Sequence, residues 1–146
     1  MTNQEYIQHY LEFIKFEKRL SPLTVKSYLR DIGILLETPP QKLLADFSID
    51  DIRRNVSILH AKGLNGKSLS RMISAWRSLF DFLNQRFHFK HNPALSIRAP
   101  KDKKQLPQTL SIDQTVKLVS ISDSSFLGIR DHAILELFYS SGLRLS

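Results

Sequence analysis

Residues 67–87 read KSLSRMISAWRSLFDFLNQRF and carry the clearest structural pattern in the chain. Apolar side chains recur here at intervals of three and four positions, which is the period of one face of an α-helix. The pattern predicts a helix from Lys67 to Phe87 whose core-facing stripe consists of Leu69, Met72, Ile73, Trp76, Leu79, Phe80 and Leu83. On a helical wheel the opposite, polar face holds Lys67, Ser70, Arg71, Ser74, Ser78 and Asp81, with Arg77 at its edge.

The composition of this polar face is unusual for a helix side that only meets water. Glu, Lys and Gln favour helices and would be the ordinary choice there, whereas this face has serines, arginines and a single acid. Small hydroxyl side chains allow a helix to approach a phosphate or the wall of a groove, and arginines can reach phosphates or base edges from it. The face therefore favours nucleic-acid contact, with a solvated face that happens to be rich in serine as the alternative.

The sequence before residue 67 predicts three more helices. Thr2 caps the first, Ser21 the second and Ser48 the third, and Glu5 and Asp51 complete capping boxes in the first and third. The polar face of the second helix consists of Lys26, Ser27 and Arg30. No convincing strand occurs up to residue 90, so the predicted fold class is all-α, with four helices in the N-terminal domain.

The overall composition excludes several classes of protein. Hydrophobic residues make up 42% of the chain, enough for a packed core, and the lack of cysteine excludes disulfides, thiol chemistry and cysteine-based zinc sites. The five histidines lack the spacing of a metal site, so neither a metal nor another cofactor is expected. Because no apolar stretch could span a bilayer and the N-terminus does not resemble a signal peptide, we expect a soluble, cytoplasmic protein without a membrane partner.

Positive charge is concentrated in the middle third of the chain. Residues 53–104 contain 12 Lys and Arg against two acids, a net charge of +10, whereas the whole chain carries +7. A basic block of this kind is typical of a surface that binds phosphates, and a purely solubilising role is the alternative. An all-helical protein-interaction domain without nucleic acid fits the helices but not this charge.

Residues 90–108, KHNPALSIRAPKDKKQLPQ, form the obvious linker of the chain. Three prolines exclude a continuous helix, and Lys101, Lys103 and Lys104 lie close together. A stiff basic connector can follow a DNA backbone, although linkers are also charged simply to remain soluble. After it, Ser111 and Gln114 predict another capped helix.

The last segment, residues 128–146, reads GIRDHAILELFYSSGLRLS. An apolar helical run meets Gly142, which is the usual left-handed residue after a helix C-terminus. Arg144 follows on the turn, and a guanidinium held in this way suits bidentate phosphate binding. The apolar side chains of residues 109–146 need partners that this segment does not contain, so we expect it to be poorly stabilised by itself.

Four segments resemble the tyrosine recombinases, the family of phage integrases and Xer-type chromosome recombinases. Residues 128–146 are similar to its first catalytic-arginine motif, R-D-x-A-I-L-x-L-x-Y-x-[ST]-G-L-R-[VIL]-S-E, without the final glutamate. EKRLSPLTVKSYLRDI (17–32) resembles the family's N-terminal signature, and LSRMISAWRSLFDFLNQRFHFKHNP (69–93) its fourth helix with the closing Asn-Pro. PKDKKQLPQTLS (100–111) resembles the interdomain linker and the opening of the catalytic domain. The Xer-type members are the most similar.

This resemblance implies a domain organisation and a set of site residues. It implies a core-binding (SAM-like) DNA-binding domain at 1–92, a basic interdomain linker at 93–108 and an N-terminal fragment of the catalytic domain at 109–146. The second and fourth helices would face the major groove, and the linker would cross the DNA. The expected DNA-binding residues are Lys26, Ser27, Arg30, Lys67, Ser70, Arg71, Ser74, Arg77, Ser78, Lys101, Lys103 and Lys104. Arg144 matches the family's first catalytic arginine, and the implied partners are double-stranded DNA and, in the full-length protein, other recombinase protomers.

The family's reaction is metal-free strand exchange. A tyrosine attacks a phosphodiester to form a 3′-phosphotyrosyl bond, a 5′-hydroxyl of another strand displaces it, and two arginines stabilise charge on the phosphate. The tyrosines here are Tyr6, Tyr10, Tyr28 and Tyr139, all before Arg144, whereas the family nucleophile lies near the end of the catalytic domain. Tyr139 is expected to lie in a helix that packs in the core, and not to act as the nucleophile.

The function implied is therefore site-specific recombination by the parent protein, in chromosome partition and cell division or in mobile-element integration. The 146 residues themselves are expected to bind duplex DNA without cleaving it. The alternative is a naturally short, non-catalytic DNA-binding or regulatory module on the same helical scaffold.

Overall fold

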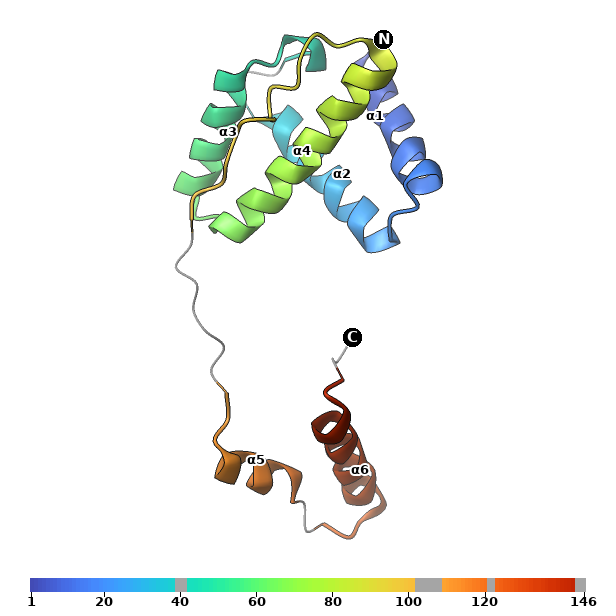
Figure 1. The fold of residues 1–146 in the computed structure, drawn as a ribbon, viewed down its shortest axis with the longest axis vertical. Helices are drawn as coiled ribbons and strands as arrows, with labels where there is room; N and C mark the ends of the chain where they lie inside the picture. Colours follow the sequence, from blue (N-terminus) through green and yellow to red (C-terminus); the bar gives the residue numbers. More distant parts are fainter. Residues whose placement is uncertain (39–41, 102–108, 121–122, 144–146) are drawn as a thin grey trace. The chain divides into compact units, whose positions relative to one another are not determined.

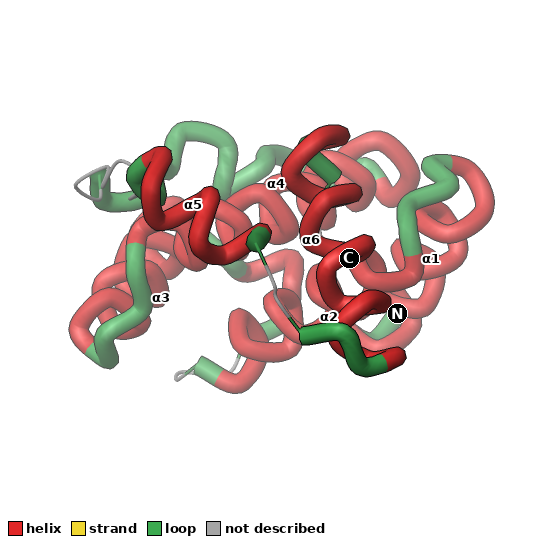
Figure 2. Tube along the Cα trace, turned by 90° about the horizontal axis from the view of Figure 1, so that it is seen from below, coloured by secondary structure: helices red, strands yellow, loops and turns green. Residues whose placement is uncertain are grey.

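The computed structural model describes residues 1–38, 42–101, 109–120 and 123–143, and within these ranges every regular element is helical (Figure 1; Figure 2). The α-helices are α1 (Asn3–Glu12), α2 (Pro22–Glu37), α3 (Ile49–Ala61), α4 (Gly66–Phe87), α5 (Ile112–Val119) and α6 (Phe126–Ser141). A π-helix, η1 (Phe13–Glu17), continues α1, and a short 3-10 helix, η2 (Leu44–Asp46), precedes α3. The predicted all-α class is confirmed. The chain divides into two compact units, Met1–Lys103 and Lys104–Ser146.

Helix α4 is the centre of the first unit. It packs against α1, α2 and α3, and its contact with α2 is the largest between any two helices of the described chain (Figure 1). All seven apolar residues of the predicted stripe are buried, and Trp76 is completely enclosed. They meet buried side chains from the other three helices and from η1, among them Tyr10, Ile14, Ile32 and Ile52. The 3.6-residue period therefore identified the core face correctly.

Four of the helix starts carry the caps that the sequence predicts, and α4 begins at Gly66, one residue before the predicted Lys67. Thr2, Ser48 and Ser111 each form a complete capping box, and Ser21 caps α2 with proline at its first position. A side-chain cap satisfies backbone N–H groups that have no partner within the helix, and its loss costs about 1 kcal/mol. The local signals are therefore sufficient to place the helices.

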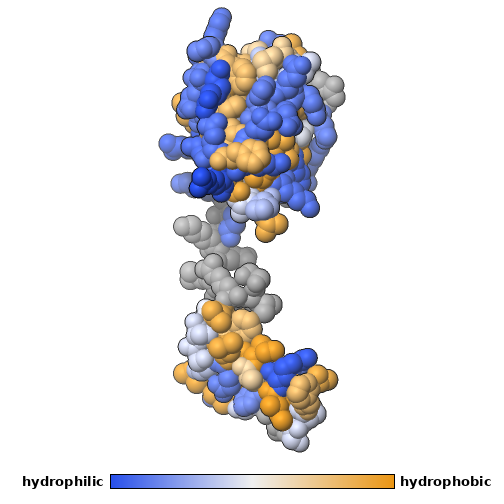
Figure 3. Space-filling model, turned by 90° about the vertical axis from the view of Figure 1, so that its right-hand side faces the viewer, coloured by the Kyte–Doolittle hydropathy of each residue, from blue (hydrophilic) through white to orange (hydrophobic). Residues whose placement is uncertain are grey.

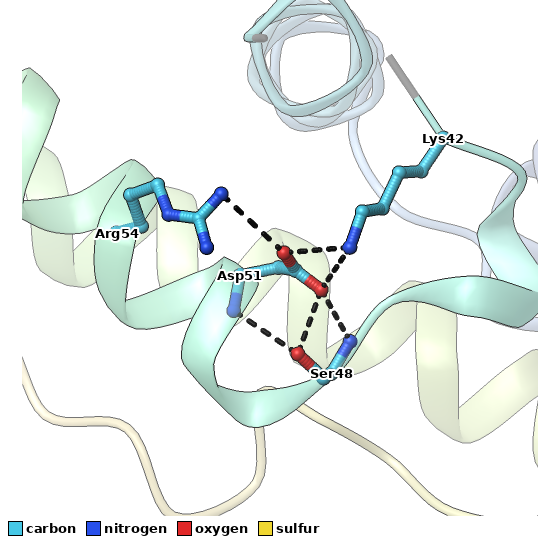
Figure 4. A network of polar contacts seen from close by, with 4 residues as sticks. All are labelled: Lys42, Ser48, Asp51 and Arg54. Atoms are coloured by element: carbon cyan, nitrogen blue, oxygen red, sulfur yellow. Dashed lines mark hydrogen bonds and ion pairs between the residues drawn. The ribbon is translucent and has the colours of Figure 1, made fainter. Parts of the chain in front are cut away.

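The start of α3 is also tied to the preceding segment through a buried carboxylate (Figure 4). Both oxygens of Asp51 accept hydrogen bonds from Lys42 Nζ at 2.8 Å. Asp51 Oδ2 also accepts from the backbone N–H and the hydroxyl of Ser48, at 2.9 and 2.7 Å. These bonds, first from Lys42 and then from Ser48, hold the pKa of Asp51 well below its ordinary value. The network fixes the chain that enters α3.

Part of the segment assigned to the linker packs onto the first unit. Pro93, Ala94 and Ile97 are buried there, although the sequence placed the linker from residue 93. Asn92 Nδ2 donates to the carbonyl of Arg77 at 2.9 Å and anchors the turn after α4. The prolines excluded a helix, but an apolar segment without a helix can still cover a core, and residues 93–97 do so here.

The second unit consists of α5 and α6 and leaves most of its apolar side chains exposed. Phe126 and Ile112 are each 83% exposed, and Figure 3 shows hydrophobic patches between hydrophilic ones on this unit. Tyr139 is 67% exposed, so within the described residues it does not occupy the core position expected for it. Gly142 ends α6 in the left-handed conformation with φ of 61°, as predicted. None of the described helices is both long and apolar enough to cross a bilayer.

Candidate nucleic-acid interface

Helices α2 and α4 bring two predicted arginines to one carboxylate. Nη2 of Arg71, on α4, donates to Oδ1 of Asp31, on α2, at 3.0 Å. Nε of Arg30 lies 3.7 Å from the same oxygen. The Asp31 side chain is fully buried, whereas those of Arg30 and Arg71 are 61% and 41% exposed. The structure thus joins two residues that are 41 positions apart in the sequence into one surface group.

Asp31 is held from several sides. Trp76 Nε1 donates to its backbone carbonyl at 2.7 Å, which fastens α2 to the core of α4. Its Oδ2 atom is buried and has no hydrogen-bond partner among the described residues. Burial raises the pKa of this carboxyl, and the positive charges of Arg71 and Arg30 oppose the rise.

The remaining predicted residues at this end of the two helices lie at the surface. Lys26 is exposed and Ser27 half-buried on α2, one turn before Arg30. On α4 the exposed positions are Lys67, Ser70 and Ser74. The hydroxyl of Ser74 donates to the carbonyl of Ser70 at 2.9 Å, which keeps it close to the helix surface and adds little bulk there. We call the set Lys26, Ser27, Arg30, Lys67, Ser70, Arg71 and Ser74 the α2–α4 face.

Two predicted residues have partners within the first unit instead. Arg77 is half-buried, and its guanidinium donates to the carbonyls of Ala94 and Ile97 at 3.4 and 3.1 Å. Ser78 accepts a hydrogen bond from the hydroxyl of Tyr10 at 2.9 Å, and burial raises the pKa of that tyrosine to about 12. The helical wheel placed both on the polar side, because it contains no information on segments that pack from elsewhere in the chain.

Of the predicted linker and catalytic residues, Lys101 is described and exposed. Lys103, Lys104 and Arg144 lie outside the described residues. No group of three or more His, Asp or Glu side chains within the described ranges could hold a metal ion.

Sequence reasoning did not assign a role to Asp31 or to Asn92. Position 31 follows Tyr28 by three residues and precedes Leu35 by four, so it falls on the apolar stripe of α2. A lone acid on such a stripe is a signal that could have been noticed, because an unpaired carboxylate is rarely buried. Asn92 belongs to the Asn-Pro pair that closes the segment resembling the family's fourth helix, but its hydrogen-bond partners are set by the turn that follows α4.

Chemically, the α2–α4 face offers cations and small hydroxyls on two helices that are fixed relative to each other. Guanidinium groups bind phosphate oxygens and the major-groove edge of guanine, and short side chains allow close approach. The face can therefore bind an extended polyanion.

Known proteins are similar to this chain over most of its length. The family described as phage integrase, N-terminal SAM-like domain, matches residues 7–86. Tyrosine recombinase XerC of Xylella fastidiosa (strain M23) is 41% identical over 143 residues, covering 96% of this chain and 49% of the relative. XerC of Ralstonia pickettii (strain 12J) is 41% identical over 146 residues, covering 96% and 44%. XerC of Pseudomonas fluorescens (strain Pf0-1) is 38% identical over 147 residues, covering 98% and 49%. The chain spans about half the length of the curated relatives it matches.

Proposed function

Because the chain belongs to the tyrosine recombinase family and matches the N-terminal portion of its Xer-type members, we propose that it binds duplex DNA through the α2–α4 face. The parent protein would carry out site-specific recombination through a 3′-phosphotyrosyl intermediate, together with other protomers on the DNA. Chromosome partition at cell division, in the cytoplasm, is the setting that similarity to XerC favours.

The observation that carries this proposal is the meeting of Arg30 and Arg71 at the surface. They come from the two helices that the family resemblance assigns to the major groove, and the contact with Asp31 keeps them together. A helix pair with fixed cations can follow the groove and contact phosphates on its rim.

DNA binding is tested by fluorescence anisotropy with a 30-base-pair duplex of random sequence between 50 and 200 mM salt. Cations that neutralise phosphates release counterions, so the affinity should fall steeply and log-linearly with salt. The double variant Lys26→Gln/Arg30→Gln should weaken binding and reduce the salt slope by about 2.

The matched control removes one cation from α3 and one from the residue that follows it. Arg53 and Lys62 are both exposed, so Arg53→Gln/Lys62→Gln changes the net charge equally but leaves the α2–α4 face intact. If both double variants weaken binding to the same extent, total charge rather than this face is responsible. A flat salt dependence of the unaltered chain would refute DNA binding itself.

We further propose that Arg144 contacts the scissile phosphate in the parent protein, and that residues 1–146 bind DNA without cleaving it. All four tyrosines precede Arg144, and Tyr10 is buried with its pKa raised to about 12. Incubation with a pool of singly nicked random duplexes should give no covalent protein–DNA complex on a denaturing gel. A trapped complex would overturn this part of the proposal.

A further inference from the structure

The α2–α4 face contains a buried acid at the point where its arginines meet. The Asp31 carboxylate is fully enclosed, and one oxygen, Oδ1, lies near both Arg71 and Arg30. The other oxygen, Oδ2, has no partner among the described residues. The following argument rests on the proposed function, that this face binds DNA.

Stability alone does not account for this carboxylate. Burying a charge is costly unless it is fully paired and hydrogen-bonded, and an apolar residue in the place of a buried ion pair is often neutral or stabilising. Asp31 is only partly satisfied, because Oδ2 contributes no bond to the described chain. Its neighbours on the α2 stripe, Ile32 and Leu35, are buried and apolar, as is usual for residues that serve only packing.

Affinity for phosphates does not account for it either. A negative charge 3.0 Å from a guanidinium lowers the local positive potential and so weakens attraction to a polyanion. A flexible, unpaired arginine would serve as well or better for phosphate contacts, which depend mainly on charge. What the carboxylate adds is a fixed direction for the guanidinium.

We propose that Asp31 is a positioning residue that holds the Arg71 guanidinium in the pose needed to read a guanine edge in the major groove. Arginine presents five N–H donors in a planar fork. The contact with Asp31 uses Nη2 of Arg71, and the side chain remains 41% exposed, so donors are left for the O6 and N7 acceptors of guanine. Fixing the fork in advance removes part of the entropy cost of forming two simultaneous hydrogen bonds.

Arg30 and Arg77 have different roles in this assignment. Arg30 lies 3.7 Å from Asp31 and is 61% exposed, so it is held more loosely and suits a phosphate on the groove rim. Arg77 donates to backbone carbonyls of the segment after α4 and does not read bases. Of the two α4 arginines Arg71 and Arg77, the proposal thus assigns base recognition to Arg71 alone.

The test is selection of duplexes with 20 randomised base pairs by the full 146-residue chain, followed by sequencing. The unaltered chain should enrich guanine at one position, and Arg71→Ala should remove that preference. Asp31→Asn is isosteric and should reduce the preference about tenfold, in line with the 1–3 kcal/mol of a bidentate pair. Binding of Asp31→Asn to the unselected pool should be equal or tighter, because a negative charge is lost. Asp31→Glu, which keeps the charge but moves the carboxylate, should also reduce the preference.

A role in folding alone is separated by the double variant Asp31→Asn/Arg71→Ala. If Asp31 acts through Arg71, this variant should show the same base preferences as Arg71→Ala. If Asp31→Asn keeps the guanine preference that Arg71→Ala loses, Asp31 does not position the guanidinium.

Three other outcomes also test whether Asp31 positions Arg71. If the Asp31 variants do not fold, Arg71→Lys replaces them: it keeps a cation but not the fork, and retention of guanine would refute the proposal. A chain that binds the pool without enriching a guanine that depends on Arg71 refutes the proposal while DNA binding stands. A chain that does not bind the pool at any salt concentration refutes both.

Discussion

Arg77 offers a sharp distinction between a structural and a DNA-reading role. The Arg77→Ala variant removes two charged hydrogen bonds to the carbonyls of Ala94 and Ile97, at 3.4 and 3.1 Å. Bonds of this type contribute about 1 kcal/mol each when they are long and only half-buried, so the free energy of unfolding should fall by about 2 kcal/mol. With a urea m-value of about 1–2 kcal/mol/M, the midpoint moves down by about 1–2 M.

Urea unfolding followed by tryptophan fluorescence measures this change in the intact chain. Trp76 is the sole tryptophan, is fully buried and belongs to α4, so its emission reports on the first unit alone. Arg86→Ala is the matched control on the same helix, because Arg86 is 54% exposed and pairs with an equally exposed Glu17. Its loss should cost less than about 1 kcal/mol. If Arg77→Ala leaves stability unchanged but weakens DNA binding, the structural reading of Arg77 is wrong.

Three further predictions concern other contacts. The pKa of Asp51 is depressed in the folded chain, so the ionised carboxylate stabilises the fold fully above the unfolded carboxyl pKa near 3.9, and this stabilisation is lost as the pH falls below that value. Asp51→Asn should therefore flatten the acid side of the profile of unfolding free energy against pH, measured by urea titration. An unchanged profile would contradict the network. Tyr10→Phe deletes the hydrogen bond to Ser78 and should cost about 1 kcal/mol in thermal melts, whereas Tyr10→Phe in a Ser78→Ala background should cost clearly less. Gly128→Ala would place a Cβ 2.7 Å from the Asp123 Cβ, and should reduce the helical circular dichroism signal at 222 nm; an unaltered or larger signal would show that the turn can yield.

The helices and their core could be predicted from the sequence because the signals are local. A cap such as Ser48 is recognised within three residues of Asp51, and the stripe of α4 repeats within one helix. Even the end of α6 at Gly142 follows from the conformational preference of glycine.

The site was only partly predictable, because partners distant in sequence decide which polar residues remain available. Ser78 is engaged by Tyr10, 68 residues away, and Arg77 by Ile97, 20 residues away. Asp31 meets Arg71 across 40 residues, and no periodicity within either helix specifies that contact. The wheel separated the buried stripe of α4 from its polar side. The partners of individual polar residues depend on how α1, α2 and the segment after α4 pack against it.

The division of the chain into two units has a consequence for its synthesis. The core of the first unit is built entirely from residues up to Ile97. A chain that emerges from the ribosome N-terminus first can therefore begin to complete this core before α5 and α6 have emerged from the ribosome. The exposed apolar side chains of α6, such as Phe126 and Leu137, then appear only after the first unit has buried its own. Vectorial folding thus keeps the two sets of hydrophobic side chains from competing during translation.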